Sequence, residues 1–290
     1  MAIQEIKHVQ KTKRKRAVRK FTMPTLDSKD TYEKEQVTIK YLETSKFDYG
    51  SKTTRDKVVK HLQHARKLIA AARKSHESIM TSYKSLSDKL AVSKDLKGLR
   101  ETFKIDPYYK KTLEHHLKFD LKDETEVVDV YYKDLLDIGK AIVLISDGLS
   151  GHVVLSDIAE KYRDPKRYMN PQTKQPFLEN WKDTEGYVVR KNVGTSTEER
   201  KSIHIGFSSV AASQSRTKTA QIILHEAAHK FAGARDEGYA SATAYNTLNV
   251  NQSLRNADSI SFYIVSVAEK EFIDADYLAK NAFESDCHIM

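Results

Sequence analysis

Residues 217–231 read Thr-Lys-Thr-Ala-Gln-Ile-Ile-Leu-His-Glu-Ala-Ala-His-Lys-Phe, and a glycine follows at position 233. The apolar residues recur at helical spacing, so the stretch predicts a helix that ends at Gly233. His225 and His229 lie four positions apart and therefore on one helical face. Both imidazoles can bind one metal ion while Glu226 reaches a water on that ion. Such polar residues are costly in an apolar helix without partners, which favours a metal centre.

The third ligand is expected downstream, because a catalytic zinc takes three protein ligands and leaves the fourth position to water. Residues 230–240 read Lys-Phe-Ala-Gly-Ala-Arg-Asp-Glu-Gly-Tyr-Ala. Gly233 permits a turn that can carry Asp236 back to the metal. Glu237 is the alternative ligand. Two further histidines are interpreted as bystanders: His204 and His288.

The order of these residues resembles the aspzincins, the family of deuterolysin and peptidyl-Lys metallopeptidase. The family pattern is His-Glu-x-x-His followed by Gly-Thr-x-Asp-x-x-Tyr-Gly. Residues 233–240 match its glycine, aspartate and tyrosine, whereas Ala234 and Ala240 replace its threonine and last glycine. Asn-Ala-Asp-Ser at 256–259 is similar to a stretch that follows in the family. The resemblance covers roughly residues 55–275.

The resemblance implies a zincin-like domain that hydrolyses peptide bonds with one Zn²⁺. It assigns roles by matching position, with zinc ligands His225, His229 and Asp236, the general base Glu226, and the oxyanion-stabilising group Tyr239. The chemistry agrees, because zinc activates water, a glutamate accepts the proton and a phenol can donate to the oxyanion. We therefore expect a zinc metalloendopeptidase.

Substrate specificity is less well determined. In lysine-specific members of the family, the aspartate that matches Asp258 and an acid three residues later bind the lysine after the scissile bond. The later position is Ser261 here, so one of the two charges is absent. Asp258 could still pair with a lysine ammonium, and an N-cap of the last helix is an equal alternative.

The front half of the chain is predicted to be helical. From Thr53 an apolar stripe without Pro or Gly steps by alternating threes and fours, which predicts one helix of about 35 residues. The stripe consists of Val58, Leu62, Ala65, Ile69, Ala72, Ile79, Tyr83, Leu86 and Leu90, with His76 in the one gap. It predicts an antiparallel hairpin with later helices, and an intermolecular coiled coil is the alternative. Further helices are expected near residues 108–117 and 127–145.

Two short alternating runs, residues 186–191 and 202–207, predict an antiparallel strand pair. The second run is expected to be an edge strand, and an extended arm or an edge strand is expected around Val37. Helices near 238–248 and 258–280 would close the chain. We expect a mostly helical α+β fold, with a long helical hairpin in front and a small antiparallel sheet beside the zinc helix. Its predicted parts are a basic tail and extended arm (1–52), a helical subdomain (53–147) and a zincin catalytic subdomain (148–290).

The positive charge of the chain is concentrated in a tail. The 290 residues carry a formal net charge of +9. Residues 1–20 contain eight Lys or Arg and one acid, Glu5, so they contribute +7 and the rest contributes +2 (9 − 7). This distribution argues against nucleic-acid binding by the body of the protein. The tail itself is interpreted as a solvated segment, with a docking, nucleic-acid-binding or nuclear-localisation role as the alternative.

Export is expected without a cleavable signal peptide. No apolar stretch follows the basic start, and the longest apolar run, residues 141–145, is far short of the about 20 needed to span a bilayer. The single cysteine, Cys287, excludes an intrachain disulfide. We therefore expect synthesis in the cytoplasm and no membrane span. Fungal members of the family are secreted and disulfide-bonded, so this combination instead favours a bacterial effector or toxin, with a secretion apparatus or an immunity protein as partner.

The expected substrate is a protein or peptide, and peptidoglycan stem peptides are included because their diamino residue resembles lysine. The alternative is a non-catalytic interaction protein with a structural or degenerate zinc site. Ala234 and Ala240 leave that alternative open. Glu226 argues against it, because a pseudoenzyme usually loses its base first.

Overall fold

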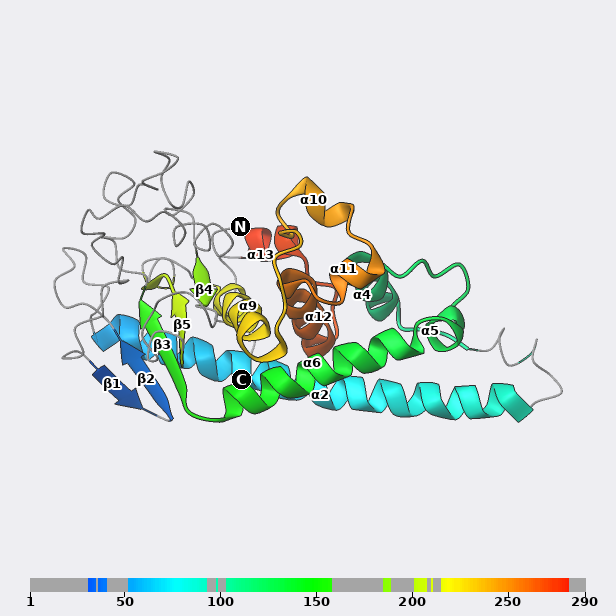
Figure 1. Ribbon diagram of the computed structural model, residues 1–290, viewed down its shortest axis with the longest axis horizontal. Helices are drawn as coiled ribbons and strands as arrows, with labels where there is room; N and C mark the ends of the chain where they lie inside the picture. Colours follow the sequence, from blue (N-terminus) through cyan, green and yellow to red (C-terminus); the bar gives the residue numbers. More distant parts are fainter. Residues whose placement is uncertain are drawn as a thin grey trace, which may run out of the picture. The chain divides into compact units, whose positions relative to one another are not determined.

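The longest element is helix α2, which runs over Lys52–Val92 and confirms the helix predicted from the apolar stripe (Figure 1). One face of α2 is buried along most of its length. The buried members of the stripe are Val58, Leu62, Ala65, Ile69, Ala72, His76 and Tyr83. Ile79 and Leu86 are partly exposed, so burial weakens toward the end of the helix.

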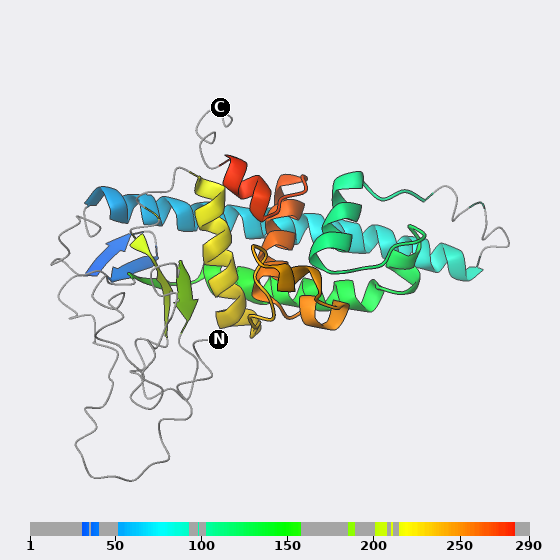
Figure 2. The same ribbon diagram turned by 90° about the horizontal axis from the view of Figure 1, so that it is seen from above.

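Helix α6 (Tyr132–Ser150) lies antiparallel to α2 (Figures 1 and 2). Arg66 Nε donates a hydrogen bond of 2.6 Å to the carbonyl of Leu149 near the end of α6. Further along α2, His76 faces Gly139, where a β-carbon would lie 2.8 Å from the imidazole Nε2. The helices approach closely there because glycine has no side chain. This pair confirms the predicted hairpin.

Helix α12 (Ala257–Glu269) lies in the core of its unit. Its side chains are buried from Ala257 to Val267. It packs against α4 (Pro107–His116) and against α9 (Arg216–Ala227), as Figure 2 shows. The proline at the start of α4 suits the first helical position, where no backbone N–H is needed. Helix α4 confirms the prediction for residues 108–117.

Three predicted helices are shorter or broken. The stretch 258–280 breaks at Lys270, whose left-handed backbone (φ 55°) ends α12 before α13 (Ala275–Lys280) begins. The stretch 127–145 is divided between the short helix α5 (Glu126–Asp129) and the helix α6. The stretch 238–248 contains only the short helix α10 (Thr243–Asn246), and another short helix, α11 (Val250–Ser253), follows it. The stretch 238–248 is therefore mostly loop.

A mixed sheet of five strands has the order β1-β2-β3-β5-β4. Its strands are β1 (Thr31–Lys34), β2 (Val37–Lys40), β3 (Val153–Asp157), β4 (Gly186–Val188) and β5 (Ser202–Ile205). The outer pairs, β1 with β2 and β4 with β5, are antiparallel. The inner pairs, β2 with β3 and β3 with β5, are parallel.

This arrangement confirms the antiparallel pair β4–β5. A strand does form around Val37, but β2 lies between β1 and β3, so its predicted edge position is wrong. The predicted edge position of β5 is wrong as well. Besides β4, β5 pairs with β3 in a register that places Leu155 opposite Ile203. All four residues of β5 are buried, as expected for an inner strand. The predicted all-antiparallel sheet is also wrong, because β3 supplies a parallel neighbour on each of its sides.

The computed structural model describes residues 31–34, 36–40, 52–92, 98, 103–157, 185–188, 201–207, 210 and 215–281. The basic tail, Cys287 and His288 lie outside them. The chain forms two compact units, one of Met1–His61 with Gly151–Ser213 and the other of Leu62–Ser150 with Gln214–Met290. This division differs from the predicted one, because most of α2, α4, α6 and helix α9, which carries His225, share a unit. The expected position of the sheet beside that helix stays a prediction.

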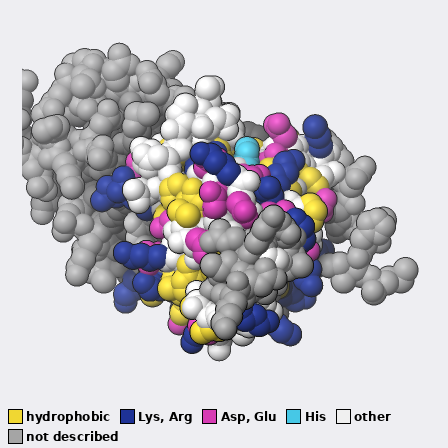
Figure 3. Space-filling model, turned by 90° about the vertical axis from the view of Figure 1, so that its right-hand side faces the viewer, with side chains coloured by type: hydrophobic (Ala, Val, Ile, Leu, Met, Phe, Trp, Pro, Cys, Tyr) yellow, Lys and Arg dark blue, Asp and Glu magenta, His cyan; other side chains and the backbone are white. Residues whose placement is uncertain are grey.

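The architecture is mostly helical with a small mixed sheet, which is an α+β class. On the face in Figure 3, basic and acidic side chains are interspersed, as expected for the body of the chain. Among the described residues, no helix combines the length and the apolar character needed to cross a membrane.

Candidate metal centre

The two histidines lie on a helix whose last turn is a π-helix. Helix α9 begins after Ser215, whose hydroxyl accepts a hydrogen bond of 3.1 Å from a first-turn amide. The helix continues as η4 (Ala228–Ala232) and ends at Gly233, whose φ of 70° is left-handed. This confirms the helix predicted for residues 217–231 and its glycine stop. Single π turns are frequent at functional sites.

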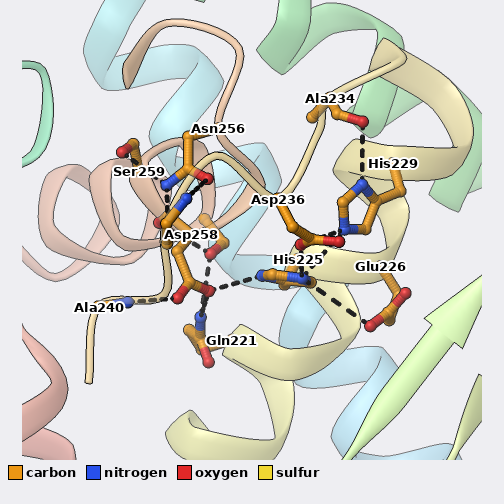
Figure 4. Close-up of polar contacts among 12 residues, drawn as sticks. Gln221, His225, Glu226, His229, Ala234, Asp236, Ala240, Asn256, Asp258 and Ser259 are labelled. Atoms are coloured by element: carbon orange, nitrogen blue, oxygen red, sulfur yellow. Dashed lines mark hydrogen bonds and ion pairs between the residues drawn. The ribbon is translucent and has the colours of Figure 1, made fainter. Parts of the chain in front are cut away.

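The three predicted ligands converge on one point (Figure 4). The Nε2 atoms of His225 and His229 are 3.1 Å apart. Asp236 Oδ1 lies 2.9 Å from Nε2 of His229 and 3.3 Å from Nε2 of His225. The three ligand atoms lie within 4.8 Å of one another, and in the described ranges they form the one such group that could hold a metal ion. The helical spacing and the turn after Gly233 therefore place the residues as expected.

The other ring nitrogens of the two histidines are already occupied by acceptors. His225 Nδ1 is 2.6 Å from Asp258 Oδ1, and His229 Nδ1 is 2.9 Å from the carbonyl oxygen of Ala234. A carbonyl or carboxylate only accepts, so Nδ1 carries the proton in each neutral ring and Nε2 presents a lone pair. Two such lone pairs and the Asp236 carboxylate repel one another unless a cation lies among them. The donor set therefore fits a bound metal ion.

The electrostatics of the cluster also favour positive charge at this point, which a proton at Nε2 supplies when no cation lies among the ligands. Burial alone would lower the pKa of His225, but contacts with Asp236 and Asp258 outweigh it and raise that pKa well above its usual value. Burial would raise the pKa of Asp236, yet its contacts with both imidazoles in their protonated form hold that pKa well below its usual range. Asp236 therefore stays ionised, and the site favours a cation.

Glu226 lies beside the cluster with one carboxylate oxygen unused. Its side chain is buried, and Oε1 is 4.0 Å from Nε2 of His225. Oε2 has no hydrogen-bond partner among the described residues. Burial raises the pKa of Glu226 to about 7. A buried oxygen without a protein partner suits a group that bonds to a water or a substrate.

Asp258 is placed to orient His225, a role that the sequence did not reveal. Its Oδ1 bonds to His225 Nδ1, and its Oδ2 accepts a hydrogen bond of 2.7 Å from the amide of Ala240. The residue is only 8% exposed. The N-cap of α12 is Asn256, so the predicted capping alternative for Asp258 is wrong. Because both oxygens are engaged inside the protein, the geometry favours orientation over binding of a substrate lysine.

Tyr239 lies beside His225. Its side chain is half exposed, and its ring lies nearly parallel to the imidazole of His225, with centroids 6.2 Å apart and an interplanar angle of 15°. Burial, followed by the negative charges of Asp236 and Glu226, raises the pKa of the phenol to about 12. The phenol is therefore protonated at neutral pH and can donate a hydrogen bond.

The remaining candidates do not join the cluster. Glu237, the alternative ligand, instead forms an ion pair with Arg255, with Nε and Oε1 2.9 Å apart. His204 lies in β5, where its ring stacks on that of Tyr187 at a centroid distance of 4.3 Å. The predictions of Asp236 as ligand and of His204 as bystander agree with these positions.

Comparisons with protein-family models, with curated proteins and with solved structures found no match to this chain. The resemblance to the aspzincins therefore rests on the two sequence motifs. Both motifs meet at the cluster, because the first supplies His225, Glu226 and His229 and the second supplies Asp236 and Tyr239.

Proposed function

We propose that the protein is a zinc-dependent metalloendopeptidase with a zincin-like domain related to the aspzincins. One observation carries the proposal. The lone pairs of His225 and His229 and the carboxylate of Asp236 converge beside Glu226, whose buried Oε2 has no partner among the described residues. A purely structural metal site needs no such free carboxylate.

Two imidazoles and one carboxylate form a ligand set that suits catalytic zinc, because they leave a fourth position open. His225, His229 and Asp236 would hold the ion. When bound, zinc would supply a Lewis acid that activates a water and polarises the scissile carbonyl.

The side chains around the ligands have separate roles in the proposed reaction. Glu226 accepts the proton of the attacking water at Oε2 and passes it to the leaving amine. Burial raises the pKa of this carboxyl, which favours its uptake of a proton. Tyr239 keeps its proton and donates a hydrogen bond to the developing oxyanion, which disperses the charge. Asp258 holds His225 in the tautomer that leaves Nε2 free.

The substrate is proposed only as a class, a protein or peptide that includes peptidoglycan stem peptides. A preference for lysine gains no support from the positions of the two residues expected to provide it. Ser261 is fully buried, and its hydroxyl is 3.0 Å from the side-chain nitrogen of Gln221. Asp258 is engaged with His225 and Ala240. Export as a bacterial effector or toxin stays a prediction from the sequence.

The test compares wild type, Glu226→Gln and Glu114→Gln on denatured protein and on peptidoglycan, with cleavage positions read by mass spectrometry. Glu114 is an exposed residue of α4 and controls for the same charge change. We expect chelator-sensitive cleavage by wild type and by Glu114→Gln. Glu226→Gln should keep its metal and lose about 100-fold or more in rate, because only the base is removed.

Cleavage by Glu226→Gln at the wild-type rate would contradict the assignment of the base. A wild-type protein that binds zinc but cleaves neither substrate would favour the interaction protein with a structural zinc site.

A further inference from the structure

The third ligand and the tyrosine lie on a loop and not on a helix or strand. We call residues 233–240 the ligand loop. It carries Asp236 and Tyr239, and it leaves η4 at the left-handed Gly233. A ligand on a loop must be held in place by other contacts if the site is to be ready for a metal. The side chain of Asn256 makes three hydrogen bonds to the backbone of this loop.

Asn256 is fully buried, and both ends of its amide face the ligand loop (Figure 4). Its Oδ1 accepts hydrogen bonds from the amides of Glu237 (3.0 Å) and Gly238 (3.2 Å). Its Nδ2 donates to the carbonyl of Gly238 (2.9 Å) and to the hydroxyl of Ser259 (3.1 Å). The amide therefore uses its acceptor and its donors at once, which neither a carboxylate nor an aliphatic side chain can do.

The backbone beside Asn256 holds the loop on the other side of Asp236. The amide of Arg235 donates to the carbonyl of Arg255 (2.7 Å), and the amide of Ala257 donates to the carbonyl of Arg235 (2.9 Å). These bonds make a short parallel bridge between Arg235 and Asn256. Asp236 is thus bracketed, with its preceding residue held by the bridge and its following residues held by the Asn256 amide.

We propose that Asn256 is a positioning residue that presets Asp236 for the metal by clamping the ligand loop to the start of α12. The hydrogen bonds of the Asn256 side chain go to Glu237, Gly238 and Ser259 and not to the donor atoms of the three ligands. The inference rests on the metal site of the proposed function and does not depend on hydrolysis. Asn256 is proposed to act through the loop and not as a ligand, because an amide is a poor ligand for zinc. The inference therefore adds a positioning residue to the site.

The experiment compares wild type, Asn256→Ala, Asn256→Asp and the control Ser266→Ala. Ser266 is a buried residue of α12, and its hydroxyl bonds to the backbone of Ile273, which is outside the ligand loop and the three ligands. The dissociation constant for Zn²⁺ is measured by competition with a chelator. The visible absorption of the Co²⁺-loaded protein reports the ligand geometry, and hydrogen exchange reports the amides of Glu237 and Gly238.

Asn256→Ala should weaken Zn²⁺ binding about 10- to 100-fold, shift the Co²⁺ absorption and speed exchange of the two amides. Asn256→Asp should fall between wild type and Asn256→Ala, because it keeps the two accepted hydrogen bonds and loses the donated ones. Ser266→Ala should unfold at a lower temperature and keep the wild-type zinc affinity and Co²⁺ absorption.

Wild-type zinc affinity and absorption in Asn256→Ala would overturn the proposal, and so would a loss of affinity no greater than that of Ser266→Ala. If Asn256→Ala does not fold, Asn256→Asp decides by the same criteria. A wild-type protein that binds no Zn²⁺ would overturn the metal site itself, and this result is recognised before any variant is compared.

Discussion

Asp258→Asn tests how the cluster is oriented, because an amide cannot make both contacts of this carboxylate. In the native site, one oxygen accepts from His225 Nδ1 at 2.6 Å and the other accepts from the amide of Ala240 at 2.7 Å. If the new amide keeps its oxygen toward His225, its NH₂ group faces the N–H of Ala240, and two donors oppose each other. If the amide flips, its NH₂ group donates to His225 Nδ1. The neutral imidazole must then carry its proton at Nε2, where the metal would bind.

Either outcome weakens the metal site. The lost interaction is a short charge-assisted hydrogen bond, which is worth about 1.5–3 kcal/mol. Loss of an outer partner of a ligating histidine lowers metal affinity about 10- to 100-fold, which corresponds to about 1.4–2.8 kcal/mol. The two ranges agree, so we expect the Zn²⁺ dissociation constant of Asp258→Asn to rise by that factor.

The assay is competition for Zn²⁺ with a chelator of known affinity at fixed pH. Asp274→Asn is the matched control, because Asp274 caps α13 by accepting a hydrogen bond from the amide of Tyr277, and Asn caps about as well as Asp. An Asp258→Asn protein with the wild-type dissociation constant would refute the orienting role. A changed preference for lysine after the scissile bond, with zinc affinity intact, would instead restore the substrate-binding role.

Two further predictions concern stability. Burial lowers the pKa of His76 to about 4, so the stability that the neutral ring confers is complete above pH 6.5 and is lost as the pH falls from there to about 4. The stability lost over this pH range is about 3 kcal/mol. Thermal unfolding is measured for wild type and His76→Gln between pH 7 and pH 4, and the variant should show the weaker pH dependence. Gly148→Ala would place a β-carbon 2.3 Å from the ring of Phe231. Urea unfolding should therefore show a free energy of unfolding lower by about 1–3 kcal/mol. The control Gly151→Ala, with open space around the new β-carbon, should not lose stability. Equal pH dependence in the first pair, or equal midpoints in the second, would contradict these accounts.

Sequence reasoning predicted the elements whose signals are local. The stripe on α2 repeats because one face of a long helix is buried, and the ligands of α9 follow from the spacing of one helical turn. The return of Asp236 was predictable because Gly233 ends the helix in a left-handed conformation. These features depend on residues within a few turns of one another.

Features that depend on distant contacts were not predicted. Strand β3 (Val153–Asp157) lies between β2 and β5, and its neighbours in the sheet are far away in the sequence. The helix break at Lys270 rests on a left-handed lysine, which no side-chain property signals. The role of Asp258 follows from a contact with a histidine on another helix, so the choice among orientation, capping and substrate binding needed the structure.

The central claim is that His225, His229 and Asp236 together hold one zinc ion. Elemental analysis of purified wild type, His229→Ala and His115→Ala after equilibration with Zn²⁺ tests it most directly. His115 is the matched control, because it lies on α4 against Phe272 and outside the cluster. We expect about one zinc per chain in wild type and in His115→Ala, and almost none in His229→Ala. A wild-type protein without zinc, or full retention of zinc in His229→Ala, would contradict the claim.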